Sequence, residues 1–359
     1  KCLVCWPHLS CSNNQWQQSE MLEAVFPVLQ KRLCSPCWEV RDSSLEFLTA
    51  LIENLEGKEE FRKSLLSSEV PRLTESLLED PESYVRASAV TAVGHLASIT
   101  CFSPELPAEG NQYNKQNTVA KLQEILSTDS EGFPRRAVIS IFNMWLAEGY
   151  MGQLEDTEQF VSRVIQTVEL DLDWEVRLMG LELVQNFCTS IIIQLGCTIC
   201  PSDPLSSAVT SCLHDRELLR IICRAKVFGF LFQSLCDCDR PLGQRACQIL
   251  LHIRDNFSAD NIPKESQGTE DSPAGHSIAW LQRTLRQGSL PWNFPTDGSN
   301  GVDFQDPESM RLALSTIDFE DLHDELNRCS DHVEKSPQSL LQDIIATVGT
   351  VEENEADCY

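Results

Sequence analysis

The C-terminal tripeptide Asp357-Cys358-Tyr359 is the part of the chain best suited to chemistry, because it places a thiol beside two carboxylates at a chain end. Cysteine thiolate and carboxylate oxygen are both zinc ligands, and a free C-terminus can enter a pocket that a loop cannot. The last eleven residues contain no basic side chain, and their other acidic members are Glu352, Glu353 and Glu355. These residue types indicate that the tail could bind a partner, with Cys358 as a ligand to a zinc ion of that partner. The alternative is a disordered tail without a role.

Cysteine pairs elsewhere suggest a zinc site less strongly. Three Cys-x-x-Cys pairs occur, namely Cys2 and Cys5, Cys34 and Cys37, and Cys197 and Cys200. The first two pairs are 28 residues apart, whereas zinc sites of this kind usually have about 15–20 residues between the pairs. We therefore favour buried or turn cysteines over structural zinc. Sixteen cysteines spread through a long chain also favour a reducing compartment, so we expect cytoplasm or nucleus.

No catalytic motif accompanies these residues. The sequence has no Gly-x-Ser-x-Gly elbow, no phosphate-binding loop with Lys and Ser or Thr, no kinase signature and no His-Glu-x-x-His. We therefore expect a binding protein with no cofactor of its own rather than an enzyme.

The charge balance indicates the kind of partner. The chain has 54 acidic and 28 basic residues, a net charge of −26, which argues against a nucleic-acid surface. Residues 301–359 alone carry 15 acidic and 3 basic side chains. Partners should therefore present basic surfaces. No uninterrupted apolar run approaches the roughly 18 residues that span a bilayer, so we expect no membrane segment.

A repeated pattern predicts the fold that positions the tail. Its clearest copies are Trp38-Glu39-Val40-Arg41, Ser83-Tyr84-Val85-Arg86 and Trp174-Glu175-Val176-Arg177. A small residue follows each Val by four positions, and with two weaker copies the small residues are Ser44, Ala89, Ala137, Gly180 and Ala246. Their spacings of 45, 48, 43 and 66 residues suit two-helix units of about 40–47 residues with one insertion.

Each patterned helix follows another amphipathic helix, and neither could bury its apolar stripe alone. We therefore predict an all-α fold, an α-solenoid of HEAT- or armadillo-like helix pairs. Ala89 and Gly180 should be buried where helices approach closely. Pro134 and Gly243 stand where the pattern expects Arg.

Composition divides the rest of the chain. The chain lacks an initial Met, which suggests a fragment of a longer protein. Asp306 to Arg328 reads as helical and acidic, and Ser336-Pro337 begins a further helix that carries Leu340 and Leu341. The predicted parts are 1–18, the end of a preceding repeat; 19–255, the solenoid; 256–300, a mostly disordered insertion rich in Pro, Gly and Ser with a helical piece near 276–287; 301–348, acidic helices packing on the solenoid; and 349–359, the extended tail.

The HEAT signature, the Ser336-Pro337 helix and the Asp357-Cys358-Tyr359 end together resemble the family of BRCA-associated ATM activators. The resemblance implies an adaptor linked to signalling by the DNA-damage kinase ATM and to a BRCA-type protein. It also implies assembly of the Integrator complex's RNA endonuclease, by binding the endonuclease and its inactive paralogue. In that role the tail would occupy the two-zinc active site and inhibit it. The alternative is a general HEAT scaffold for DNA-damage or growth-signalling kinases, for which the tail has no active-site role.

Overall fold

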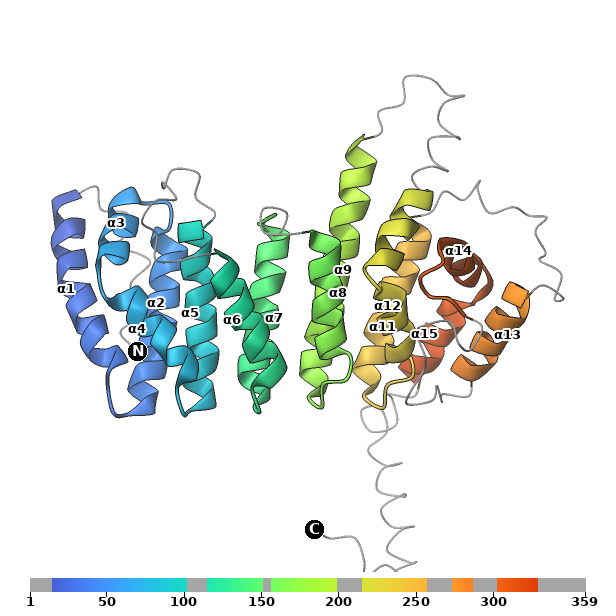
Figure 1. Ribbon diagram of the computed structural model, residues 1–359, viewed down its shortest axis with the longest axis horizontal. Coiled ribbons are helices and arrows are strands. Elements are labelled where there is room, and N and C mark those ends of the chain that lie inside the picture. Colours follow the sequence, from blue (N-terminus) through green and yellow to red (C-terminus); the bar gives the residue numbers. More distant parts are fainter. Residues whose placement is uncertain are drawn as a thin grey trace, which may run out of the picture. The chain divides into compact units, whose positions relative to one another are not determined.

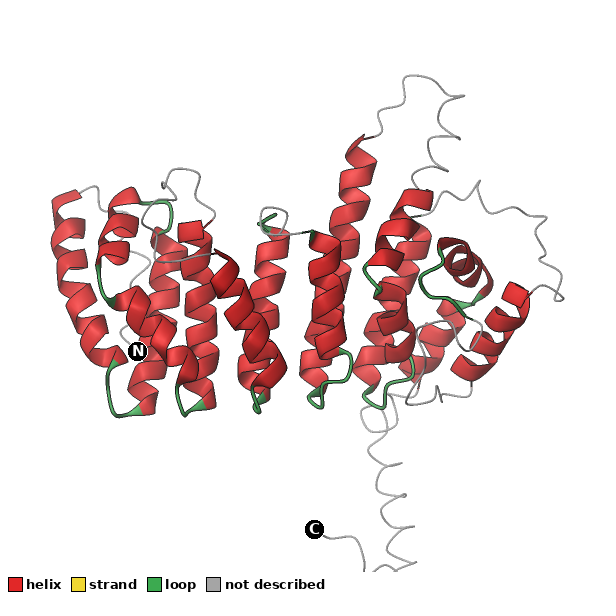
Figure 2. Cartoon of the chain, in the orientation of Figure 1, coloured by secondary structure: helices red, strands yellow, loops and turns green. Residues whose placement is uncertain are grey.

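The computed structural model describes residues 15–101, 115–150, 156–198, 215–256, 273–286 and 302–328. Every regular element among these residues is helical, which confirms the predicted all-α class (Figure 1, Figure 2). The helices are α1 (Gln15–Leu33), α2 (Trp38–Leu55), α3 (Glu59–Ser67), α4 (Val70–Ser76), the 3₁₀ helix η2 (Leu77–Glu79), α5 (Ser83–Cys101), α6 (Lys115–Thr128), α7 (Gly132–Ala147), α8 (Thr157–Val168), α9 (Trp174–Thr198), a helical stretch over 215–224, α11 (Val227–Ser234), α12 (Arg240–Asp255), α13 (Pro273–Arg286), α14 (Pro307–Thr316) and α15 (Phe319–Arg328).

The chain divides into two compact units, residues 1–193 and residues 194–359. In the first unit α2, α5 and α7 stand in a row, and α1, α4 and α6 pack beside them as the first helices of successive pairs (Figure 1). This arrangement is the predicted solenoid of helix pairs. The short helix α3, between α2 and α4, is an addition that the repeat pattern did not predict.

The repeat positions form the core as expected. On α5, Val85, Ala89, Val93 and Leu96 are buried at the helical period. The small residues Ser44, Ala89, Gly180 and Ala246 are also buried. Each large apolar side chain removed from water in this way stabilises the fold by about 1.5–3 kcal/mol.

The predicted register is wrong by one residue in the third copy of the pattern along the chain. Ala137 is only half-buried, whereas Val138 is fully buried. Pro134 is buried in the place that Val85 takes in α5. Arg135, not residue 134, therefore occupies the Arg position. The partner that fixes this register lies 36 residues further along the chain, so no local pattern could reveal it.

Arginines at this position form what we call the Arg–Asp ladder. Arg41 binds Asp80, Arg86 binds Asp129 and Arg135 binds Asp171, each through two hydrogen bonds of 2.7 or 2.8 Å to the two carboxylate oxygens. Each arginine also donates to the backbone carbonyl six residues before it, on Ser35, Asp80 and Asp129 respectively. Bidentate charge-assisted bonds of this kind fix geometry as well as adding energy. The ladder therefore joins each helix pair to the next.

Gly94 lies where α5 closely approaches α7. The Cβ of an alanine at this position would lie 2.4–2.6 Å from three side-chain carbons of Ile141, which is itself buried and β-branched. The indole N–H of Trp145 donates to the Gly94 carbonyl at 3.3 Å. We therefore expect Gly94→Ala to lower the free energy of unfolding by about 1–3 kcal/mol through overpacking, measured by urea denaturation.

Gly57 provides the matched control, because nothing lies within 4 Å of the Cβ that alanine would add there. Gly57→Ala should leave stability unchanged or raise it slightly. Combining Gly94→Ala with Ile141→Ala should cost less than the sum of the two single changes, since the second removes the obstructing carbons. Equal midpoints for Gly94→Ala and the parent chain would contradict the close approach.

Among the described helices, α9 alone contains a stretch with the length and apolar character of a membrane span. Residues Trp174–Leu195 are long and apolar enough, although they include Glu175, Arg177 and Glu182. Among them Leu181, Val184, Phe187 and Cys188 are buried within the protein. Such burial is typical of a core helix in a solenoid, so length and composition alone do not make α9 a membrane helix.

The acidic helical segment predicted from Asp306 to Arg328 consists of two helices, α14 and α15. Ile317 has an extended backbone (φ −79°, ψ 129°) and ends α14. The Asp318 carboxylate then accepts from the N–H of Asp321 at 3.0 Å and begins α15. Within the second unit, α15 packs on α12, where Cys247 Sγ donates to the Phe319 carbonyl. The rings of Phe304 and Phe319 pack near Phe232 in the same core.

A charged contact joins α12 to α15. Arg254 donates two hydrogen bonds to the carboxylate of Glu320, which lowers the pKa of Glu320 to about 2. Because the folded pKa lies below the unfolded value, the contact stabilises docking above about pH 4.3 and loses its effect as the pH falls toward 2. Glu320→Gln should speed hydrogen exchange in α15 at pH 7. The corresponding loss in the free energy of opening should be less than about 1 kcal/mol, because the ion pair is exposed. An equally large difference from the parent at pH 2 would contradict this assignment.

Candidate functional site

The site residues predicted from the sequence, Glu352, Glu353, Glu355, Asp357, Cys358 and Tyr359, lie outside the described residues, as does the helix predicted after Ser336. Their roles stay predictions. Cys2, Cys5 and Cys200 also lie outside the described ranges. The zinc interpretation of those pairs is therefore untested.

Cys34 and Cys37 are described, and both are exposed. They flank the turn between α1 and α2, where Cys37 Sγ donates to Glu39 Oε2 at 2.7 Å. No third His, Cys, Asp or Glu among the described residues lies close enough to these two cysteines to complete a group that could hold a metal ion. This placement agrees with the turn-cysteine interpretation.

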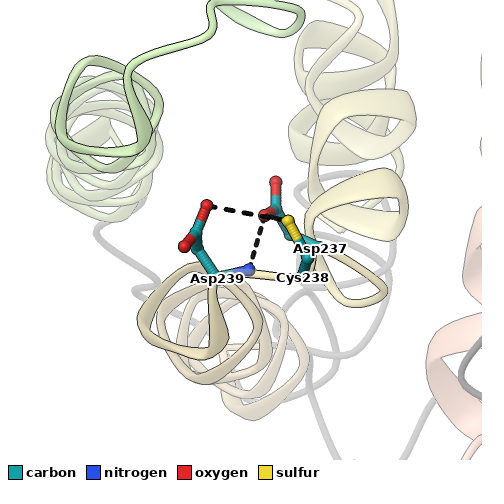
Figure 3. Close-up of side chains that lie close together, drawn as sticks. All are labelled: Asp237, Cys238 and Asp239. Carbon is teal, nitrogen blue, oxygen red and sulfur yellow. Dashed lines mark hydrogen bonds between the residues drawn. The ribbon is translucent and has the colours of Figure 1, made fainter. Parts of the chain in front are cut away.

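One group of three potential metal ligands does occur among the described residues, at Asp237, Cys238 and Asp239, where their ligand atoms lie within 4.8 Å of one another (Figure 3). The three residues are consecutive and form the turn between α11 and α12. Asp237 Oδ1 accepts from the backbone N–H of Asp239 at 2.9 Å, and Cys238 Sγ lies 3.7 Å from oxygens of both neighbours.

The same turn recurs at the corresponding place of earlier repeats. Asp80, Asp129 and Asp171 each accept, through Oδ1, the backbone N–H two residues later at 3.0, 2.9 and 2.8 Å. Such Asx turns let a side chain replace a backbone hydrogen-bond partner where a helix begins. The cluster at Asp237 is therefore explained by repeat architecture, and its acidic residues need no metal.

Buried cysteines are unsuited to either metal binding or nucleophilic chemistry. Burial raises the pKa of Cys188, Cys223 and Cys247 to about 12. Their thiols therefore stay protonated at neutral pH, and the thiolate is the reactive form.

The carboxylates of the Arg–Asp ladder are also unsuited to chemistry, because structural hydrogen bonds already occupy them. Burial acts to raise the pKa of Asp129, but the hydrogen bonds from Arg86 and from the Glu131 N–H outweigh it and the net pKa is lowered. Asp129 is thus ionised and saturated by structural partners. Among the described residues we find no nucleophile with an oriented base, which leaves surfaces as the candidate sites.

The turns before α2, α5, α7 and α9 lie along one edge of the first unit, the lower edge in Figure 2. Each carries an aromatic residue, and these are Trp38, Tyr84, Phe133 and Trp174. Three of them stand in the repeated pattern, but that pattern was defined by its Val, Arg and small residue and predicted no aromatic site. Their exposure could not be predicted, because an aromatic residue at a helix start is equally common in a core.

The fold defines this chain as a helical-repeat solenoid protein whose candidate sites are surfaces. A family model described as "Integrator complex assembly factor BRAT1" matches residues 1–359, and the chain belongs to this family. The family predicted from the tail and the repeats is the same one, so that resemblance is confirmed.

Curated relatives named "Integrator complex assembly factor BRAT1" are similar over nearly the whole chain. The protein of Mus musculus is 46% identical and covers 98% of this chain, and that of Ailuropoda melanoleuca is 46% identical and covers 94%. The protein of Danio rerio is 32% identical and covers 93%. The matched regions are 40–42% of these relatives, so the chain spans about two fifths of their length.

Among solved structures, the chain is similar to a crystal structure of an engineered protein, with 12% identity, a TM-score of 0.40, and coverage of 81% of this chain and 97% of that one. A designed armadillo repeat protein has 13% identity and a TM-score of 0.37, with 82% and 100% coverage.

Proposed function

We propose that this chain is a non-enzymatic assembly factor that binds the Integrator RNA endonuclease together with its inactive paralogue and blocks the two-zinc active site with its C-terminal tail. The family and the printed names of the relatives support the assembly role. The single observation that carries the active-site role is the tail sequence, which combines one thiol, several carboxylates and a free chain end.

Zinc chemistry explains why Cys358 is the central residue. A thiolate binds zinc at about 2.3 Å and is held in its deprotonated form by the metal. In a two-zinc hydrolase the metals hold the hydroxide that attacks the phosphate. Cys358 bound there would take the place of water or substrate, so cleavage could not proceed.

The acidic residues give the tail a route to the metals. A nuclease channel is basic because it must hold an RNA phosphate backbone. Glu352, Glu353, Glu355 and Asp357 place negative charges along eleven residues, which would reach about 36 Å if fully extended. The tail would therefore follow the path that RNA otherwise takes.

The solenoid supplies the second point of attachment. The Arg–Asp ladder keeps its helix pairs in a fixed relation, so a surface contact with the partner is held steadily. Linking this contact to the tail raises the effective concentration of Cys358 at the active site to the millimolar range. Two weak contacts can then act as one strong one.

A second candidate function is a scaffold for ATM or another signalling kinase, with a BRCA-type protein as a further partner and with activity in cytoplasm and nucleus. It would depend on the repeat surface alone. Deleting residues 357–359 and measuring co-purification with the endonuclease separates the two. Loss of the endonuclease with retention of other partners supports the proposed function, whereas unchanged co-purification favours the scaffold.

A further inference from the structure

Aromatic side chains at the starts of α2, α5 and α7 form a row of neighbouring rings, of which Trp38 is half-buried and the other two are exposed. The ring centroids of Trp38 and Tyr84 are 5.8 Å apart, and those of Tyr84 and Phe133 are 4.7 Å apart. Tyr84 and Phe133 are 48% and 41% exposed. At the next turn Leu172 is 94% exposed and Trp174 is 38% exposed. We call these five residues the turn-edge stripe.

Single exposed apolar residues are ordinary, but a contiguous row marks an interaction surface. The aromatic side chains come from the starts of α2, α5, α7 and α9, and Leu172 comes from the turn before α9, so the repeat itself places them at one edge. The stripe lies within the first unit throughout.

One arginine of the chain already shows how the stripe holds a cation. The guanidinium carbon of Arg136 lies 5.2 Å from the centroid of the Phe133 ring. Its Nη2 donates to Asp173 Oδ2 at 2.5 Å, and Nη1 forms an ion pair with Glu175. A guanidinium group is thus held by a ring face and by carboxylates of the next repeat, a combination that suits arginine better than lysine.

Carboxylates stand beside the other rings of the stripe. Glu39, Glu82 and Glu131 are exposed and lie within two residues of Trp38, Tyr84 and Phe133 respectively. Glu82 and Glu131 form no ion pair with any described residue. Residues 34–42, 80–86, 129–136 and 169–177 together hold ten carboxylates and five guanidinium groups. The edge therefore attracts cations.

The basic groups and helix ends nearby do not reverse this sign. Arg41, Arg86 and Arg135 are each neutralised by two hydrogen bonds to a carboxylate of the ladder. At the starts of α5 and α7, the Asx turns of Asp80 and Asp129 occupy backbone N–H groups that would otherwise attract anions.

These charges decide the occupant. Nucleic acid and the chain's own segment 301–359, with 15 acidic and 3 basic residues, carry the same sign as the edge. A purely apolar partner would desolvate the carboxylates without pairing them. A segment rich in arginine supplies both an aliphatic stem for the rings and a charge for the carboxylates.

Spacing sets the register of such a segment. From Trp38 to Phe133 the two ring-to-ring steps of 5.8 and 4.7 Å cover at most about 10.5 Å, and three residues of a polyproline II chain, which make one turn, advance about 9.3 Å. Three residues of such a chain therefore span these two steps. We propose that the turn-edge stripe binds an extended segment of a partner protein that carries arginine at every third position. This surface is separate from the tail and does not depend on the proposed function.

The test uses a fluorescein-labelled peptide that repeats Arg-Ala-Pro four times, titrated with the whole chain and followed by fluorescence anisotropy. Replacing Tyr84 and Phe133 together by alanine should weaken binding about tenfold, because each ring contributes a cation–π contact. Glu82→Lys and Glu131→Lys should each weaken it about threefold or more. A chain that lacks residues 357–359 should bind the peptide as the parent does.

Matched controls distinguish a built site from general attraction to an acidic protein. Glu60 on α3 is exposed and off the stripe, so Glu60→Lys makes the same charge change elsewhere in the first unit. It should leave affinity nearly unchanged, as should Val28→Ala. A peptide of the same composition with its four arginines consecutive should bind more weakly. Three results would each overturn the proposal: absence of binding, equal binding of the two peptides, or equal losses of affinity for Glu60→Lys and Glu82→Lys. The two charge variants test the proposal even if the alanine variant does not fold.

Discussion

Replacing Arg86 by methionine is expected to lower the free energy of unfolding by about 2–4 kcal/mol. The side chains of Arg86 and Asp129 are only 15% and 8% exposed, and removing one partner of a largely buried ion pair leaves the other charge uncompensated. The change also removes the donor to the Asp80 carbonyl. Urea denaturation of the purified chain measures the loss.

An exposed pair within the same unit provides the control. Arg72 binds Glu69 through side chains that are 65% and 62% exposed, so Arg72→Met should cost less than about 1 kcal/mol. Combining Arg86→Met with Asp129→Asn should cost less than the sum of the single changes. If Arg86→Met were no more destabilising than Arg72→Met, the ladder would not be what joins the repeats.

Acidification should reduce the effect of Arg86→Met. The pKa of Asp129 is lowered in the folded chain, so the pair stabilises the fold above the unfolded pKa of about 3.9 and loses that effect as the pH falls through the folded value. The difference between parent and variant should therefore be full at pH 7 and shrink below about pH 4.

The second large effect is expected at Cys358. Cys358→Ala should weaken binding to the endonuclease heterodimer by at least about tenfold, since even outer-shell zinc partners contribute that much to metal affinity. Cys358→Ser should fail similarly, because a neutral hydroxyl is a poorer zinc ligand than thiolate. Both variants should melt like the parent. Affinity measured by titration calorimetry tests this expectation.

Changes to the acidic residues of the tail and changes to its free end should affect partner binding in different ways. Reversing the charges of Glu352, Glu353 and Glu355 should slow association and reduce its dependence on salt, because these groups would steer the tail to a basic channel. Added residues after Tyr359 should impair docking if the chain end must fit the pocket. Unchanged association rates in the charge-reversed variant would argue against the channel.

The periodic spacing of apolar residues made the fold predictable. Val85, Ala89 and Val93 are four residues apart, and this spacing places them on one face of an α-helix. The error at Ala137 arose where two arginines are adjacent, since the pairing of Arg135 with Asp171 is a long-range contact. The break at Ile317 depended on packing of α14 and α15 against α12, which local helix propensity does not encode.

The candidate site was predictable in part. A thiol, carboxylates and a chain end within three residues are a local signal, so the tail could be proposed as a site without knowledge of the fold, and its role stays a prediction. The turn-edge stripe required the structure, because exposure of Tyr84 and Phe133 depends on how successive repeats stack. Gly94 was missed for the same reason, since its close neighbour Ile141 is 47 residues away in the sequence.

The proposal that the tail blocks the active site is tested most directly by RNA cleavage. Purified endonuclease heterodimer is titrated with the parent chain and with Cys358→Ala, and the rate of cleavage of a labelled RNA is followed at each concentration. The parent should abolish cleavage near a one-to-one ratio, whereas the variant should leave cleavage nearly intact at the same concentrations. Equal affinity and equal inhibition by the two proteins would contradict zinc ligation by Cys358.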